Sequence, residues 1–177
     1  MSTTWKIDQS HSDVNFKVKH LMISTVTGKF ETYDGTVVQK NSEDSFNGSS
    51  ISFTADVASI STGVADRDNH LRSNDFFNAE QFPTMKFEAS SFEKVSDEEY
   101  TLNGNLTIRD NTKPVTLRAT FNGITSDMWG GTRAGFEITG TIKRKEFGLL
   151  WNATTELGGV VVSDDVKLAL DIQLVKQ

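Results

Sequence analysis

Most of this chain alternates between apolar and polar residues, and this alternation restricts its fold more than any other feature. In the stretch VNFKVKH, residues 14–20, Val14, Phe16 and Val18 alternate with polar side chains. Successive side chains of a strand point to opposite faces, so a period of two predicts strands with one buried face. The pattern recurs in ISFTADV (51–57), MKFEAS (85–90), YTLNGNLTI (100–108), VTLRATF (115–121), AGFEITGTI (134–142) and VKLALDIQL (166–174).

The strands are expected to form one antiparallel sheet that closes into a barrel. Residues 28–38 add a further, less regular strand, and turn-forming stretches such as KVSDEE (94–99) and RDNTKP (109–114) separate the runs. One polar face per strand is typical of an antiparallel sheet, and closure removes exposed edges from a sheet of about eight strands. Glycines inside the strands at 104, 135 and 140 are predicted to mark bends, bulges or a close backbone approach.

Two segments depart from the strand pattern. The sequence GVADRDNHLRSNDFFNAEQFP, residues 63–83, gathers charged side chains ahead of a pair of phenylalanines. A short helix is expected near residues 64–80, capped by Asp66 or Ser73 and followed by a chain stop at Pro83. Residues 20–24, HLMIS, are compatible with one helical turn.

Size and composition indicate one globular domain over residues 1–177. The net charge of -6 argues against nucleic-acid binding, and no apolar run is long enough to span a membrane. No cysteine is present, which excludes disulfides and thiolate chemistry. The first residues lack the basic and apolar regions of a secretory signal, so a cytoplasmic location is expected, or a periplasmic one if a signal has been removed.

Catalytic and metal-binding motifs are not found. The chain has 3 histidines, without HxH or HExxH spacing, and it has no GxSxG elbow. The sequence HSD at 11–13 has residue types of a hydrolase, but neighbours on a strand point to opposite faces. We therefore expect no metal and no catalytic residue. Asp68 and Arg72 are spaced for an i,i+4 ion pair on a solvated helix face, and an arginine that faces a ligand headgroup is the alternative.

Alternation does not decide whether the barrel is packed or hollow. An eight-stranded barrel can be filled by side chains or can hold one small ligand. The chain contains 12 phenylalanines, of which Phe76, Phe77 and Phe82 fall in the segment outside the strands. They suit the lid of an apolar cavity and equally a plug of the core.

Four stretches resemble, in the same order, motifs of the YceI-like polyisoprenoid-binding family. They are WKIDQSHSDVNFKVKHLMISTVTGKF (5–30), SISTGVADRDNHLRSNDFFNAEQFPTMKF (59–87), YTLNGNLTIRDNTKPVTL (100–117) and IKRKEFGLLWN (142–152). The resemblance implies an all-β, lipocalin-like extended antiparallel barrel with a helical segment at its side or mouth. It also implies a non-catalytic protein that holds a polyisoprenoid, prenyl phosphate or isoprenoid quinone for transport, storage or protection. No cofactor other than the bound lipid and no stable membrane insertion are expected, and a homodimer is consistent with the resemblance.

The pattern and the resemblance together predict two groups of site residues. Side chains expected to contact the lipid are Phe16, Val18, Leu21, Phe30, Phe53, Phe76, Phe77, Phe82, Phe87, Leu106, Leu117, Phe136, Ile138, Phe147 and Trp151. Side chains expected to fix the cap or face a headgroup are His11, His20, Arg67, Asp68, His70, Arg72, Arg109 and Arg144. Two alternatives stay open: an enzyme of isoprenoid or lipid metabolism that uses His11 or His70, and a packed barrel that acts through protein contacts.

Overall fold

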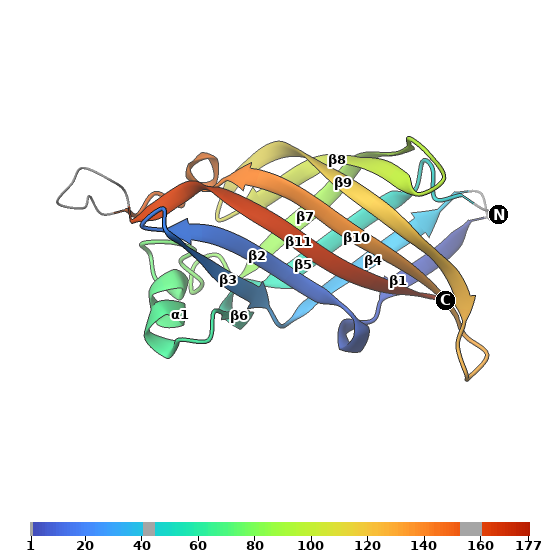
Figure 1. Ribbon diagram of the computed structural model, residues 1–177, viewed down its shortest axis with the longest axis horizontal. Helices are drawn as coiled ribbons and strands as arrows, with labels where there is room; N and C mark the ends of the chain where they lie inside the picture. The colour runs from blue at the N-terminus through green and yellow to red at the C-terminus, as the bar shows by residue number, and fades with distance from the viewer. Residues whose placement is uncertain (1, 41–44, 153–160) are drawn as a thin grey trace.

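The computed structural model describes residues 2–40, 45–152 and 161–177. Within these ranges the chain forms an 11-stranded antiparallel sheet, one α-helix and three short 3-10 helices (Figure 1). The strands are β1 (Thr3–Ile7), β2 (Asp13–His20), β3 (Ser24–Phe30), β4 (Tyr33–Gln39), β5 (Ser50–Asp56), β6 (Ile60–Ser61), β7 (Thr84–Lys94), β8 (Glu99–Ile108), β9 (Asn111–Ser126), β10 (Thr132–Lys143) and β11 (Val162–Lys176). The helices are η1 (Gln9–His11), η2 (Val57–Ser59), α1 (Ala65–Arg72) and η3 (Arg144–Phe147).

Pairing along β11 closes the sheet into a barrel. One edge of β11 pairs with β10, while its other edge pairs with β2 and, beyond the interruption at η1, with β1. The neighbouring positions of the wall are also each made of two consecutive strands. On one half β2 pairs with β3 and β3 with β6, and on the other half β1 pairs with β4 and β4 with β5. The interrupted strands and the continuous strands β7 to β11 make a ring of 8, which agrees with the barrel expected from the sequence.

One stretch of the barrel wall lacks a backbone ladder. Among the described residues, β6 pairs only with β3, while β7 pairs with β5 and β8. Helix α1 lies beside β6 at this end, far from the two chain termini (Figure 1). We call this the helix end, which also carries the β2–β3 turn (residues 21–23) and η3. The opposite end, with both termini and the β9–β10 turn (residues 127–131), is the termini end.

The alternating residues face the inside of the barrel, as the sequence predicts. Along β10, Ala134, Phe136 and Ile142 are buried, whereas Glu137 and Thr139 between them are exposed. Interior glycines make room for neighbouring side chains, because a Cβ on Gly140 would lie 2.3 Å from Leu117 Cδ2. Gly135 coincides with a register shift between β9 and β10, which is the bulge that an interior glycine indicates.

Local details of the two segments outside the strand pattern differ from expectation. Residues 20–24 form a hairpin turn rather than a helical turn, with Leu21 and Met22 in the left-handed region at φ values of 52° and 60°. Helix α1 lies within the expected range, but its N-cap is Val64, which has no capping side chain. Ser73 is the C-cap instead, and β7 starts directly after Pro83 as expected.

Candidate functional site

The barrel encloses an apolar cavity of about 220 Å³ that extends from one end towards the other. It is bordered near the termini end by Phe46 and Phe92 and near the helix end by Leu71 and Phe77. A single water needs only about 10–15 Å³ on this kind of measure, so the space is far larger than a packing defect. Its lining is apolar apart from a few strand residues and Arg144.

Most of the predicted lipid-contacting side chains border this cavity. The structure places Phe16, Val18, Phe30, Phe53, Phe76, Phe77, Phe87, Leu106, Leu117, Phe136 and Ile138 against it. Their inward orientation follows from the period-two pattern and from the position of the lid. Their contact with a lipid stays a prediction.

The remaining predicted contacts lie elsewhere. Leu21 is 38% exposed in the β2–β3 turn, and Phe82 is half-buried beneath the guanidinium of Arg109, 5.5 Å from its ring centroid. Phe147 is fully buried in η3 but does not border the cavity. Trp151 packs against His70 and Phe76, outside the lining. These residues fall in turns and short helices, where strand alternation gives no direction.

Several lining residues were not among the predicted contacts. Val166, Leu168 and Leu170 on β11 border the cavity, and their alternation was sufficient to find them. Phe46 precedes β5 in a stretch whose polar neighbours indicate only a turn. Leu71 comes from α1, whose weak amphipathic pattern does not reveal the inward face.

The exposure of the inward residues shows that the barrel is hollow rather than packed. Phe16, Phe53, Leu106, Ile138 and Leu168 point inward from well-paired strands, yet each remains only partly buried. In a packed core such side chains would be covered on every side, since protein interiors have few voids larger than water. Their accessible surface therefore faces the cavity.

An aromatic cluster closes the cavity at the termini end. The ring of Phe46, which is 1% exposed, lies 5.4 Å from that of Trp5 and 5.1 Å from that of Phe136. The backbone N–H of Phe46 donates to the Tyr100 hydroxyl at 3.2 Å. Because both the ring and the backbone of Phe46 are held, this end is a fixed part of the core.

A lid made by residues 73–82 closes the helix end. Phe76 and Phe77 are buried, and the Phe77 ring meets Phe30 edge-on at 6.0 Å between centroids. Arg109, in the β8–β9 turn, donates to the carbonyl oxygens of Asn74 at 3.1 Å and Phe76 at 2.9 Å. Side chains, rather than a strand ladder, therefore hold the lid to the barrel.

The charged residues of helix α1 form hydrogen bonds that attach the helix to the chain segment before it. Asp68 is buried and accepts from the backbone N–H and hydroxyl of Thr62 at 2.8 and 2.6 Å, while Arg67 donates to Thr62 as well. Arg72 donates to the carbonyl oxygens of Ala58 and Ile60 at 2.9 and 3.0 Å. The expected ion pair between Asp68 and Arg72 is wrong, because both side chains instead hold the helix to residues 58–62, which precede it.

His70 lies on the outer side of the lid. Its Nε2 is 2.8 Å from Asp75 Oδ2, and its ring packs edge-on against Phe76 and Trp151. His20 is exposed at the end of β2. Neither histidine is among the residues that border the cavity.

Among the described residues that line the cavity, Arg144 is the charged one, and it is 2% exposed. Its guanidinium donates to the carbonyl oxygens of Leu149, Trp151, Val162 and Ser163 at 2.6–3.2 Å. Burial lowers the pKa of Arg144 below its ordinary value. The side chain thus fixes the chain around η3 and the start of β11 at the helix end, and its charge lies at the cavity wall.

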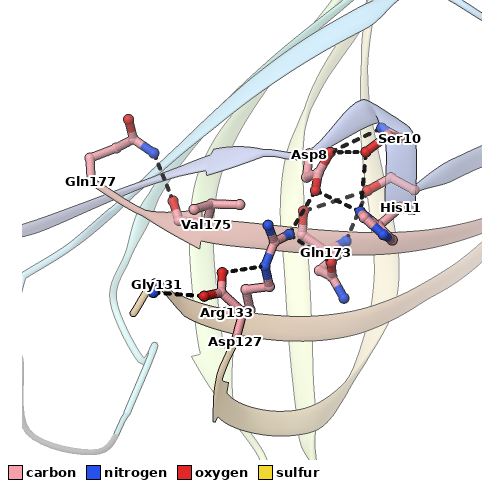
Figure 2. A network of polar contacts seen from close by, with 10 residues as sticks. Asp8, Ser10, His11, Asp127, Gly131, Arg133, Gln173, Val175 and Gln177 are labelled. Carbon is pink, nitrogen blue, oxygen red and sulfur yellow. Dashed lines mark hydrogen bonds and ion pairs between the residues drawn. The ribbon is translucent and has the colours of Figure 1, made fainter. Parts of the chain in front are cut away.

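A polar network on the outside of the barrel ties the termini end together (Figure 2). Arg133 donates to Asp8 Oδ2 at 2.6 Å and to Asp127 Oδ2 at 3.0 Å, and it also contacts Gln173. The hydrogen bond from Ser10 and the contacts with Arg133 and His11 hold the pKa of Asp8 far below its usual range. The backbone N–H of Gly131 lowers the pKa of Asp127 in the same direction.

The group Asp8, Ser10 and His11 has the residue types of a catalytic triad but not its geometry. The Ser10 hydroxyl lies 3.1 Å from His11 Nδ1, and Asp8 Oδ2 lies 2.8 Å from the same nitrogen. A triad needs the serine and the carboxylate on opposite ring nitrogens. His11 is also exposed and does not border the cavity, so this group serves the network in Figure 2.

The described residues hold no group of three or more histidine, aspartate and glutamate side chains placed to share a metal ion. Within the same ranges, none of the helices has the length and apolar content that a membrane span requires.

Comparison with known proteins identifies similar chains over the whole length. Residues 5–174 match the YceI-like domain. Protein YceI of Salmonella newport is 40% identical over 179 residues, which cover 100% of this chain and 89% of that protein. BcnA of Burkholderia cenocepacia has a TM-score of 0.78 at 23% identity, covering 94% of this chain and 98% of that one. A polyisoprenoid binding domain from Saccharophagus degradans, implicated in plant cell wall breakdown, has a TM-score of 0.71 at 14% identity, covering 96% and 97%. The last two likenesses concern the fold alone.

Proposed function

We propose that this chain, which belongs to the YceI-like family, holds one long-chain apolar or amphiphilic lipid inside its barrel. The candidates are a polyisoprenoid, a prenyl phosphate or an isoprenoid quinone. The protein binds the lipid without a catalytic step and keeps its chain away from water during transport, storage or protection.

The observation that carries this proposal is the hollow apolar interior. Inward side chains such as Phe53, Leu106 and Ile138 leave accessible surface in a cavity that runs along the barrel. Apolar cavities of this size stay dry and take up apolar molecules, because water there would have no hydrogen-bond partners. A polyisoprenoid-binding domain of the same fold supports this choice of ligand class.

The binding free energy should come from the length of the buried chain. Each methylene moved from water into an apolar site contributes about 0.8 kcal/mol. A ligand series that differs only in chain length should therefore gain about fourfold in affinity per buried methylene. The gain should end when the chain exceeds the length of the cavity.

The alternatives receive less support from the described residues. A packed barrel would leave no cavity of about 220 Å³. An enzyme that used His11 or His70 would need these groups near the ligand, but neither borders the cavity. The packed barrel also leaves the partial exposure of the inward side chains without a role.

A pair of substitutions on β10 tests the proposal. Ile138→Asp places a carboxylate in the cavity wall, whereas Thr139→Asp places the same charge on the exposed outer face. Burying a charge against an apolar chain costs several kcal/mol, so Ile138→Asp should weaken lipid binding by about a hundredfold or more. The readout is displacement of a fluorescent polyene fatty acid by prenyl phosphate.

The matched variant should bind like the unchanged protein. Circular dichroism and thermal unfolding establish that both variants are folded before their affinities are compared. Equal affinity of a folded Ile138→Asp variant and of Thr139→Asp would mean that the ligand does not occupy the barrel.

A further inference from the structure

The β2–β3 turn presents three apolar side chains to solvent at the helix end. Leu21, Met22 and Ile23 are 38%, 60% and 83% exposed. The turn is nevertheless held in place, because the backbone N–H of Leu21 donates to the Val161 carbonyl at 2.8 Å and that of Ile23 to the His20 carbonyl at 3.2 Å. A fixed turn with this composition projects an apolar tip from the barrel.

The backbone of this turn is unfavourable for the residues that occupy it. Leu21 and Met22 have φ values of 52° and 60°, in the left-handed region that glycine and asparagine tolerate best. Burial of the Met22 side chain does not offset this backbone strain, because the side chain lies mostly in solvent. Strain retained at an exposed apolar turn is the kind of outlier that points to a binding role.

A basic surface lies directly behind the apolar tip. Lys17 and Lys167 are direct cross-strand partners on the outer face of β2 and β11, and Lys19 continues this face towards the turn. Like charges placed opposite each other destabilise a sheet. In the described parts of the chain, none of these lysines forms an ion pair with a carboxylate, and Asp165 is engaged by Lys143. This cluster stands out in a chain with a net charge of -6.

The basic surface, the tip and the cavity belong to the same strand. Val18 lines the cavity from the inner face of β2, between Lys17 and Lys19 on the outer face. The strand then ends in the apolar turn, at the end of the barrel that is closed by the lid rather than by a complete ladder (Figure 1). A surface that held this tip would lie beside the way into the cavity.

We propose that the helix end docks onto a lipid bilayer that contains anionic phospholipids. Met22 and Ile23 enter the interfacial region of the bilayer, while Lys17, Lys19 and Lys167 approach the phosphates from behind them. Apolar burial together with basic residues is the combination that holds peripheral proteins at such surfaces. The inference rests on the proposed function, because it gives a lipid a path between bilayer and barrel that avoids water.

The termini end supplies a matched control for this surface. Met128 and Trp129 in the β9–β10 turn are 89% and 81% exposed, so the two ends carry comparable apolar tips. However, the charged neighbours of that turn, Asp127 and Arg133, are already engaged with each other, and that end of the cavity is sealed by the Phe46 cluster.

The test is flotation of the full chain with phosphatidylcholine vesicles, with and without added phosphatidylglycerol. We expect Met22→Asn with Ile23→Ser to lower partitioning onto the mixed vesicles by about tenfold or more. Replacing Lys17, Lys19 and Lys167 by glutamine should have an effect of at least this size, and salt should weaken binding of the unchanged protein. Met128→Asn with Trp129→Ser should bind as before.

Capture of the fluorescent polyene fatty acid in solution is measured for the same variants. The turn variant should keep its affinity for this probe, because Met22 and Ile23 do not border the cavity. If the unchanged protein captures the probe but does not bind vesicles, the docking proposal is overturned and the proposed function stands. If it neither captures the probe nor binds vesicles, both proposals are overturned. Vesicle binding that depends on the Met128 and Trp129 pair alone would also overturn the docking proposal. A lower oligomeric mass of the Met22→Asn, Ile23→Ser variant in sedimentation would overturn the docking proposal too, because the tip would then be a contact between copies of this chain.

Discussion

The two ends of this barrel are closed by different kinds of contact. At the termini end, the Phe46 cluster fills the interior, and the network of Asp8, Arg133 and Asp127 joins strands on the outside. At the helix end, β6 and β7 form no ladder within the described residues, and the lid is attached there by side chains such as Arg109. Regions that depend on few side-chain contacts open at lower free energy than paired strands. The comparison teaches that the helix end should open more readily than the termini end, and we propose it as the place where a ligand enters.

The largest loss of stability should come from removing the Phe46 ring at the termini end. Phe46→Ala removes the centre of an aromatic cluster and should lower the free energy of unfolding by about 3–5 kcal/mol. Phe77→Ala removes the same group from the lid, where the ring is 9% exposed and contacts the ring of Phe30, whereas Phe46 is 1% exposed and contacts three rings. About half the cost is therefore expected for Phe77→Ala. Denaturant unfolding of both variants measures the difference. An equal or larger loss for Phe77→Ala would contradict the distinction between the ends.

A smaller effect is expected from loosening the lid. Arg109→Ala removes three hydrogen bonds to residues 74–76 and the contact with Phe82, which should cost about 1–3 kcal/mol of local stability. Hydrogen exchange should then speed up in the lid, and a bound lipid should dissociate about tenfold faster.

The control for the lid variant is Arg118→Ala. Arg118 forms an exposed ion pair with Glu99 on the outer face, away from the lid, so its removal should leave the dissociation rate unchanged. Dissociation that responds equally to both substitutions would show that the lid does not limit exit.

The smallest effect should appear in the pH dependence of stability. The pKa of Asp8 is lowered in the folded protein, so its ionised form stabilises the fold at pH values above its unfolded pKa of about 3.9. This contribution is lost progressively as the pH falls from that value towards the much lower pKa of the folded state. Asp8→Asn should therefore be less stable than the unchanged protein at pH 7, and the two should converge in acid.

Thermal unfolding from pH 7 to pH 2 measures how the difference narrows below about pH 4. Asp34→Asn is the comparison variant, since it removes an exposed ion pair with Lys6 that lies outside the network. A difference between Asp8→Asn and the unchanged protein that stayed constant with pH would show that the network does not depend on the ionised carboxylate.

The alternation in the sequence was sufficient to predict the barrel and the inward faces of its long strands. Phe136 and Ile138 on β10 lie where a period of two places them. The predicted strand at 28–38 is divided in the structure, since β3 ends at Phe30 and β4 begins at Tyr33. This interruption lies where the chain changes its partner strand, because β3 pairs with β2 and β4 pairs with β1. The local alternation of residues does not indicate which strand is the partner.

The position of the lid could also be predicted, but not the way it is held. Phe76 and Phe77 were expected to face inward, and they border the cavity. Arg72 and Arg109 hold the helix and the lid through backbone carbonyl oxygens, which no residue type signals in a sequence. The Asp68 carboxylate likewise accepts from the backbone N–H of Thr62, although its spacing from Arg72 indicated an ion pair.

The central claim, that this barrel holds a long-chain lipid, is tested most directly by mass spectrometry. The protein is purified without detergent, its organic extract is analysed against that of the Ile138→Asp variant, and the intact protein is then measured under native conditions with added prenyl phosphate, quinone or fatty amide. We predict one long-chain molecule per protein chain, present in the extract or taken up on addition, and lost in the variant. An empty extract together with no uptake of any of these ligands would contradict the account.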